Sequence, residues 1–233
     1  MIEVKTKYPI AVESLDHTHP QGVQYDNTIS TEFILNVENY FNKKINILDL
    51  GCAGAGLTVA MHDRGHISVG IDGSDKCYNV SDEQLQHFGK YPEGYDNWNT
   101  HLNKILFTAD ITKPYEIIKD NEDLKFDLIT AWDVLEHFDP DQVETFFQQM
   151  TSKLKDGGMF VASIALFPDG SVLPWNDKPN INYHKSLFDS YWWIRELDKY
   201  FVKQNYPFGV CNRAIDPNQP PHGDYVVYAG IKK

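Results

Sequence analysis

Short apolar runs that end in Gly or Asp, separated by segments with helical spacing, most strongly limit how this chain of 233 residues can fold. Each run is too short for a stable helix and fits a strand that is buried on both faces. Buried strands that alternate with helices are typical of a parallel sheet covered on both sides. The runs that carry this prediction are INILDL, HISVGID, KILFTAD, FDLITAWD and MFVASIAL.

The segments between these runs predict helices, and the end of the chain predicts a different strand arrangement. Helices are expected over about Thr31–Phe41, over LTVAMHDRG, over about 140–154 and around Tyr191–Trp193. The sequence Asp156-Gly157-Gly158 should end the third of these, because glycine favours helix termination. Two last runs, KYFVKQ and DYVVYAGIKK, indicate an antiparallel hairpin added to the parallel sheet.

Length and composition favour one domain with a real core. Hydrophobic residues make up 42% of the chain and aromatic residues 13%, which excludes a wholly disordered chain. We expect a single domain over 1–233. It divides into an N-terminal lid or helical segment (1–44), a ligand-binding core (45–164), and a substrate-pocket insertion with the terminal hairpin (165–233).

Charge and cysteine content limit the partners and the compartment. The chain has 21 Lys and Arg against 33 Asp and Glu, a net charge of −12, which argues against binding long nucleic acids through their phosphates. Three cysteines without a CxxC pair indicate neither a disulfide framework nor a zinc site. The sequence has no apolar run of membrane-spanning length and no signal-peptide layout. We expect a cytoplasmic protein that acts on a small molecule.

A glycine-rich segment, Asp49-Leu-Gly51-Cys-Ala-Gly54-Ala-Gly56, lies between the first predicted strand and the helix that follows it. Glycines at this place let a backbone approach a ligand closely, and the helix N-terminus supplies hydrogen-bond donors. The spacing fits neither the dinucleotide pattern GxGxxG nor the phosphate-binding pattern that ends in GK[ST]. A tight turn without a ligand remains the alternative.

Acidic residues follow the next two predicted strands. Asp72 ends the second strand, 21 residues after Gly51, where α/β nucleoside sites place a carboxylate on the ribose hydroxyls. Asp110 ends the third strand, near where an adenine amino group would lie. Each carboxylate could instead cap a helix, but their recurrence at successive strand ends points to the crevice where such sheets bind ligands.

In order and spacing, five motifs resemble the motif series of class I S-adenosylmethionine-dependent methyltransferases: ILDLGCAGAG, VGIDGSD, FTADIT, FDLITAWDVLEHF and LKDGGMFVASI. The resemblance covers about residues 45–164. It implies a Rossmann-like, seven-stranded mixed sheet with helices on both faces and a reversed last strand. It also implies S-adenosylmethionine as the cofactor. The residues it places at the cofactor are Gly51, Gly54 and Gly56 by the methionine part, Asp72 on the ribose, Asp110 and Ile111 near the adenine, Asp49 at the loop or the amino group, and the neighbouring Cys52, Gly73 and Trp132.

A second set of side chains, Asp133, Glu136 and His137, begins where the fourth strand ends. In a first helical turn these would share one face. His184, after the fifth strand, could approach the same crevice. Two carboxylates and two imidazoles suit Mg²⁺ or Mn²⁺ with positions left for a substrate oxygen.

This set is similar to the ExxEH plus distal His site of small-RNA terminal 2′-O-methyltransferases, and to the ExxEH of ubiquinone-pathway O-methyltransferases. Asp133 stands where those proteins have Glu, and its shorter side chain reaches less far. Without a metal, His137 or His184 would serve as the general base, with Asp133 beside them. His137 could also pack the pocket or bind substrate.

The sequence therefore predicts a methyltransferase that acts on a hydroxyl of a small polar acceptor, such as a sugar that is free or nucleotide-linked, with help from a divalent metal. One alternative is an N-methyltransferase, or one acting on a nucleic-acid end, that uses a histidine base without metal. Another is a protein that binds the cofactor without catalysis.

Overall fold

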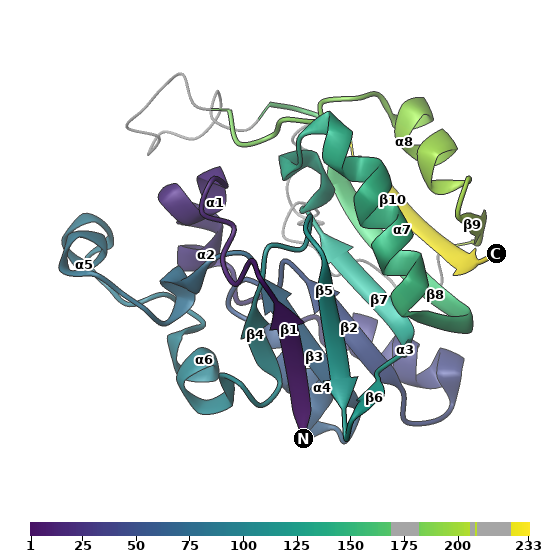
Figure 1. Ribbon diagram of the computed structural model, residues 1–233, viewed down its shortest axis with the longest axis horizontal. Coiled ribbons are helices and arrows are strands. Elements are labelled where there is room, and N and C mark those ends of the chain that lie inside the picture. Colours follow the sequence, from purple (N-terminus) through teal and green to yellow (C-terminus); the bar gives the residue numbers. More distant parts are fainter. Residues whose placement is uncertain (169–181, 206–207, 209–224) are drawn as a thin grey trace.

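The structure is a computed structural model that describes residues 1–168, 182–205, 208 and 225–233. In this part of the chain the strands form two sheets (Figure 1). The larger sheet has seven strands in the order β4-β3-β2-β7-β8-β10-β9. Their bounds are β2 Asn46–Leu50, β3 Ile67–Asp72, β4 Leu106–Thr108, β7 Phe126–Trp132, β8 Leu154–Ala165, β9 Phe201–Lys203 and β10 Tyr225–Lys232.

The pairing of the larger sheet confirms the mixed topology expected from the sequence. The strands β4, β3, β2, β7 and β8 pair in parallel, and β10 is antiparallel to both β8 and β9. The apolar runs behave as expected for buried strands: four of the five residues of β2 are buried, as are six of the seven residues of β7. The larger sheet thus has the Rossmann-like, seven-stranded mixed topology that the sequence predicts, with its last strand reversed.

Each face of the larger sheet carries its own apolar core, because neighbouring residues of a strand point to opposite faces. Leu48 and Ile129 join the core that packs against α7 and α8, whereas Ile47 and Leu128 join the core under α3 and α4. In Figure 1, α7 and α8 lie in front of the sheet and the fainter α3 and α4 lie behind it. The helices thus cover both faces.

The helices flank this sheet or connect its strands. Residues of α7 at helical spacing are fully or nearly fully buried, as the sequence indicated. The bounds are α1 Leu15–Thr18, α2 Gln21–Tyr25, α3 Thr31–Phe41, α4 Gly56–Asp63, η1 Asp75–Cys77, α5 Asp82–Phe88, α6 Tyr95–His101, η2 Leu135–His137, η3 Pro140–Gln142, α7 Val143–Lys153 and α8 Ser190–Leu197.

The end of α7 differs from the expectation. The helix ends at Lys153, and β8 begins at once with Leu154, which is buried and pairs with Phe126. The sequence Asp156-Gly157-Gly158 therefore lies inside β8, where the register with β7 shifts and Gly157 adopts a φ of 74°. This glycine forms a bulge in a strand and does not terminate a helix.

A second, three-stranded sheet was not expected from the sequence. It consists of β1 Ile2–Thr6, β5 Tyr115–Lys119 and β6 Glu122–Asp123, all antiparallel. Tyr115 and Ile117 of β5 belong to the core under α7. The start of the chain is thus anchored beside the sheet, and residues 7–30, here called the N-terminal segment, run from β1 to α3.

Part of the predicted substrate-pocket insertion and terminal hairpin (165–233) lies outside the described residues, at 169–181, 206–207 and 209–224. Among the helices that the structure describes, none has both the length and the apolar character needed to cross a bilayer.

Candidate active site

A cavity of about 690 Å³ lies at the carboxyl ends of the parallel strands. The strand ends contribute Gly51 after β2, Asp72 on β3, Asp110 after β4 and Trp132 on β7. The N-terminal segment forms a second wall, and the stretch around His184 a third. This is the edge at which open α/β sheets bind their ligands.

The cavity contains only part of the cofactor-binding set expected from the sequence. The expected residues that line it are Gly51, Asp72, Gly73, Asp110, Ile111 and Trp132. Those outside its lining are Asp49, Cys52, Gly54 and Gly56. The indole Nε1 of Trp132 is buried and has no hydrogen-bond partner among the described residues.

The three glycines of the loop have different roles. Gly51 has a φ of 69°, and a Cβ there would lie 2.3 Å from a methyl carbon of Val134, so the position requires glycine. A Cβ at Gly54 would meet the carbonyl oxygen of Asp26 at 2.2 Å, and one at Gly56 would meet that of Asn27 at 2.6 Å. Of the three glycines, only Gly51 lines the cavity. Gly54 and Gly56 leave room for the N-terminal segment to pack on the loop.

Asp49 and Asp72 are both buried, and burial raises the pKa of each to about 6. Asp49 lies below the cavity and accepts a hydrogen bond from Thr130 Oγ1 at 2.7 Å. Asp72 lies at the cavity wall and accepts from the backbone N–H groups of Ala53 and Ser74, each at 2.8 Å. Asp72 thus connects the glycine loop of β2 to the loop after β3.

Backbone hydrogen bonds join the N-terminal segment to the loops that follow β2, β3 and β4. Asp110 donates its N–H to the carbonyl of Tyr8, and Ala11 donates to Gly73, at 2.9 and 2.8 Å. Gly54 donates to the carbonyl of Asp26 at 2.5 Å. These bonds hold the segment along one wall of the cavity.

The predicted metal set is only partly assembled. Glu136, His137 and His184 place possible ligand atoms within 4.8 Å of one another. Asp133 does not join them. It has a φ of 52°, outside any helical turn, and its carboxylate accepts from Ser163 Oγ at 2.7 Å. The shared helical face expected for these residues is absent because η2 begins only at Leu135.

Glu136 is fully buried beneath this group. Its Oε1 accepts from the backbone N–H of Ala165 at 2.9 Å, and its Oε2 has no hydrogen-bond partner among the described residues. Burial, together with the nearby Asp133, raises the pKa of Glu136 to about 8. Near neutral pH this carboxyl can hold a proton, or ionise when a cation approaches.

The two histidines are oriented by oxygen atoms at Nδ1. His184 Nδ1 lies 2.6 Å from the carbonyl oxygen of Phe167, and the rings of His137 and His184 are 4.9 Å apart. Because a carbonyl only accepts, His184 carries a proton on Nδ1, and the lone pair of its neutral form is on Nε2.

The residue missed by the sequence interpretation is Asp16, on α1. Its Oδ2 lies 2.9 Å from His137 Nδ1, an ion-pair distance. Burial is the largest single influence and raises the pKa of this carboxyl, but His137, Ser14 and His184 together lower the pKa of Asp16 below its ordinary value. Asp16 and His137 both line the cavity. Their separation along the chain left no local signal by which the pair could have been predicted.

Comparison with known proteins places this geometry in a family. The family model described as a methyltransferase domain matches residues 24–206. The ubiquinone biosynthesis O-methyltransferase of Pelagibacter ubique (strain HTCC1062) is 27% identical over 152 residues, which cover 64% of this chain and 55% of that protein. The match thus spans little more than half of the relative's length.

Solved structures share the fold at low identity. The PH0226 protein of Pyrococcus horikoshii OT3 has a TM-score of 0.54 and 14% identity, covering 97% of this chain and 95% of that one. The 1,6-didemethyltoxoflavin-N1-methyltransferase of Burkholderia thailandensis has a TM-score of 0.52 and 15% identity, covering 87% and 79%. Because the family model matches most of its length, this chain belongs to the family of methyltransferase domains.

Proposed function

We propose that this protein is an S-adenosylmethionine-dependent methyltransferase that methylates a hydroxyl oxygen of a small polar acceptor. The observation that carries the proposal is that one cavity is lined both by Asp72, at the position where α/β nucleoside sites place a carboxylate, and by the two oriented histidines His137 and His184. The family match and the relative named an O-methyltransferase support it.

The residues at the strand ends fit S-adenosylmethionine. Asp72 and Gly73 would hold the ribose, Asp110 and Ile111 would lie near the adenine, and Gly51 leaves room for the methionine part. When bound, the cofactor supplies an electrophilic methyl group on a sulfonium. The cavity is lined by seven carboxylates and two lysines among the described residues, which favours a cationic cofactor over its neutral product.

The protein's own contribution is alignment and proton removal. Holding the acceptor oxygen in line with the methyl group supplies much of the rate. The neutral form of His184 carries its lone pair on Nε2, so this nitrogen can accept the hydroxyl proton as the bond to carbon forms. His137, whose ring centroid is 4.9 Å away, can play the same part for an acceptor in a slightly different pose.

A divalent cation is the second way in which the same residues could activate the hydroxyl. One carboxylate oxygen of Glu136 and two imidazole nitrogens suit Mn²⁺ better than Mg²⁺, which prefers oxygen ligands throughout. The unpartnered Oε2 of Glu136 supports this fit. Such an ion would lower the pKa of the bound oxygen.

The acceptor we propose is an uncharged sugar or similar polyol. The excess of carboxylates in the cavity disfavours a phosphate or diphosphate group, so a free sugar fits better than a nucleotide-linked one. Vicinal hydroxyls could chelate a cation at the histidine cluster. Aromatic residues of the lining, such as Phe167 and Tyr183, offer faces on which a ring can stack.

The test has two steps. Calorimetry should show that the purified protein binds S-adenosylmethionine and S-adenosylhomocysteine, and absence of both would overturn the proposal. Transfer of a labelled methyl group is then measured with a panel of sugars, nucleotide sugars, phenols, primary amines and short RNAs. Transfer to hydroxyls supports O-methylation. Transfer to amines alone would establish the N-methyltransferase alternative, and binding without any transfer would favour a non-catalytic protein.

A further inference from the structure

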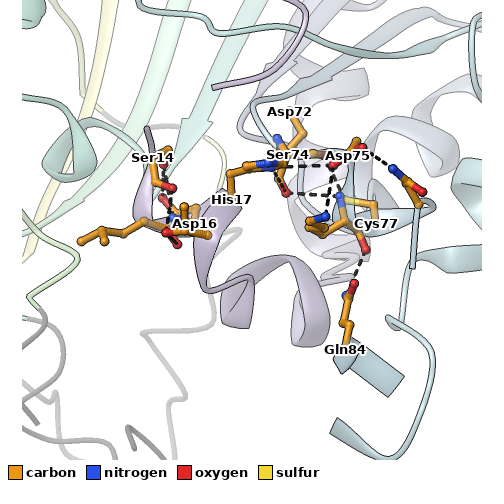
Figure 2. A network of polar contacts seen from close by, with 12 residues as sticks. Ser14, Asp16, His17, Asp72, Ser74, Asp75, Cys77 and Gln84 are labelled. Carbon is orange, nitrogen blue, oxygen red and sulfur yellow. Dashed lines mark hydrogen bonds and ion pairs between the residues drawn. The ribbon is translucent and has the colours of Figure 1, made fainter. Parts of the chain in front are cut away.

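The short helix α1 carries two consecutive side chains that contact different parts of the structure. Asp16 contacts His137 Nδ1 at 2.9 Å, and His17 Nδ1 lies 3.2 Å from Ser74 Oγ and 3.7 Å from Asp75 Oδ1. Figure 2 shows Asp16 and His17 leaving the helix in opposite directions. The helix therefore joins the histidine cluster to the loop that follows Asp72.

We infer that Asp16 is a positioning residue for His137. It holds the proton of the neutral imidazole on Nδ1 and the lone pair on Nε2, and it does so only while α1 is docked on the cavity. The inference rests on the proposed function for its role in catalysis. The inference applies whether His137 acts as a general base or as a metal ligand, because an Nε2 lone pair is needed either to accept a proton or to bind a cation.

Electrostatics sets the tautomer. A carboxylate oxygen has no hydrogen to donate, so a lone pair on Nδ1 at 2.9 Å from Asp16 Oδ2 would be repelled, whereas an N–H is attracted. Only 34% of the Asp16 side chain and 18% of the His137 side chain are exposed, so solvent screens this contact incompletely.

The docking of α1 has its own identifiable contacts. Ser14 caps the helix, since its Oγ accepts from the backbone N–H of Asp16 at 3.2 Å. Ala11 donates to the carbonyl of Gly73, just before the helix. His17 completes the attachment at Ser74. The carboxylate of Asp16 is thus carried to His137 by a helix that is held on the cofactor side of the cavity.

Nuclear magnetic resonance of the histidine side chains tests the proton position without any acceptor. The protein is labelled with ¹⁵N-histidine and measured at pH 8, with and without S-adenosylhomocysteine, and the His137 signal is assigned by its loss in His137→Gln. We expect the wild-type ring to carry its proton on Nδ1. A proton on Nε2 in the wild type would overturn the inference before any Asp16 variant is made.

Variants of Asp16 then test whether its carboxylate sets the tautomer of His137. Asp16→Ala should give a mixture of tautomers at His137. Asp139→Asn removes a different carboxylate of the same cavity, one that pairs with Lys185 at 3.1 Å, and should leave the tautomer unchanged. If Asp16→Ala does not fold, Asp16→Leu replaces it, because its side chain is of similar size and has no acceptor oxygen. An unchanged His137 tautomer in the folded variant would overturn the inference.

Kinetics with an acceptor that the wild type methylates tests the consequence. Asp16→Ala should lower kcat about 10- to 100-fold, part of the usual contribution of general-base catalysis, and leave the KM for S-adenosylmethionine within about twofold. An unchanged kcat would overturn the positioning role. Failure of the wild type to bind S-adenosylmethionine would instead refute the proposed function, while the resonance data still decide where the His137 proton lies.

Discussion

Asp49 is the buried carboxyl at which the pH dependence of the free energy of unfolding can be tested most directly. It is only 4% exposed, and burial raises its pKa to about 6 from an unfolded value of about 3.9. Between these values the folded chain binds more protons than the unfolded chain, so stability falls as the pH rises from about 4 to about 6 and is then level.

We predict that Asp49→Asn removes this slope. Relative to the variant, the free energy of unfolding of the wild type should fall by about 2–3 kcal/mol between pH 4 and pH 6.5, at about 1.4 kcal/mol for each unit of pKa difference. Urea denaturation across this range, without ligand, measures it. Parallel pH profiles for the two proteins would contradict the assignment.

Asp72 should carry part of the cofactor affinity. Asp72→Ala would remove the proposed hydrogen bonds to the ribose and also the bonds that hold Ala53 and Ser74, so binding of S-adenosylmethionine should weaken by about 1.5–3 kcal/mol. Asp96→Ala, on the exposed face of α6, is the control and should bind normally. An unchanged calorimetric affinity for Asp72→Ala would exclude the ribose role.

Metal removal separates the two ways of activating the hydroxyl. If Glu136, His137 and His184 hold a divalent ion, excess EDTA should abolish methyl transfer and leave S-adenosylmethionine binding nearly intact, and Mn²⁺ should restore transfer. His184→Ala should then behave like the chelated enzyme. Full activity in EDTA would leave a histidine as a simple general base.

At the scale of elements, α1 and α5 offer a matched pair of helix caps. Ser14 caps α1 at the cavity, and Ser81 Oγ accepts from Gln84 N–H at 3.1 Å to cap α5, outside the cavity lining. Ser14→Ala should lower kcat/KM by up to about fivefold, the equivalent of about 1 kcal/mol of capping energy. Ser81→Ala should leave it unchanged. Equal effects of the two changes would show that α1 docking does not limit activity.

Strands and helices with a strong local signal were predictable from the sequence. The helix α3 has the bounds expected for it. The strands β2, β3 and β7 match expected apolar runs to within one residue at each end, and β8 covers all but the last residue of MFVASIAL. Strand β1 escaped notice although Ile2 and Val4 alternate with exposed residues, because a five-residue pattern is weak without its partner β5. The hairpin at the end was expected because its apolar runs follow the last parallel strand.

The site was predictable where it follows strand ends and not where it depends on tertiary contact. Asp72 and Asp110 lie where a parallel sheet must place them. The carboxylate of Asp133 was expected at the cluster, but a left-handed φ and the hydroxyl of Ser163 hold it elsewhere. Asp16 reaches His137 only after the N-terminal segment has docked, and a sequence pattern does not encode that distance.

At the scale of the whole molecule, we expect the N-terminal segment to open and close as one cooperative unit. The amides of Ala11, Gly54 and Asp110 all depend on its docking, since each bond joins it to a different strand-end loop. We predict that these three amides exchange with solvent at closely similar rates, and that S-adenosylhomocysteine slows all three together. Amides in the middle of β2 should exchange far more slowly. Three unrelated rates would contradict a common opening.

The second sheet gives the N-terminal segment a fixed attachment at one end, and α3, with Phe33 and Val37 fully buried, gives it another. A stretch that is pinned at both ends returns to its contacts without a search through solution, because the entropy of closing a loop grows only with the logarithm of its length. We therefore expect ligands to enter and leave by a brief local detachment of this segment while both sheets stay intact. The rate of ligand exchange should then depend on a few backbone hydrogen bonds and not on the global stability of the fold.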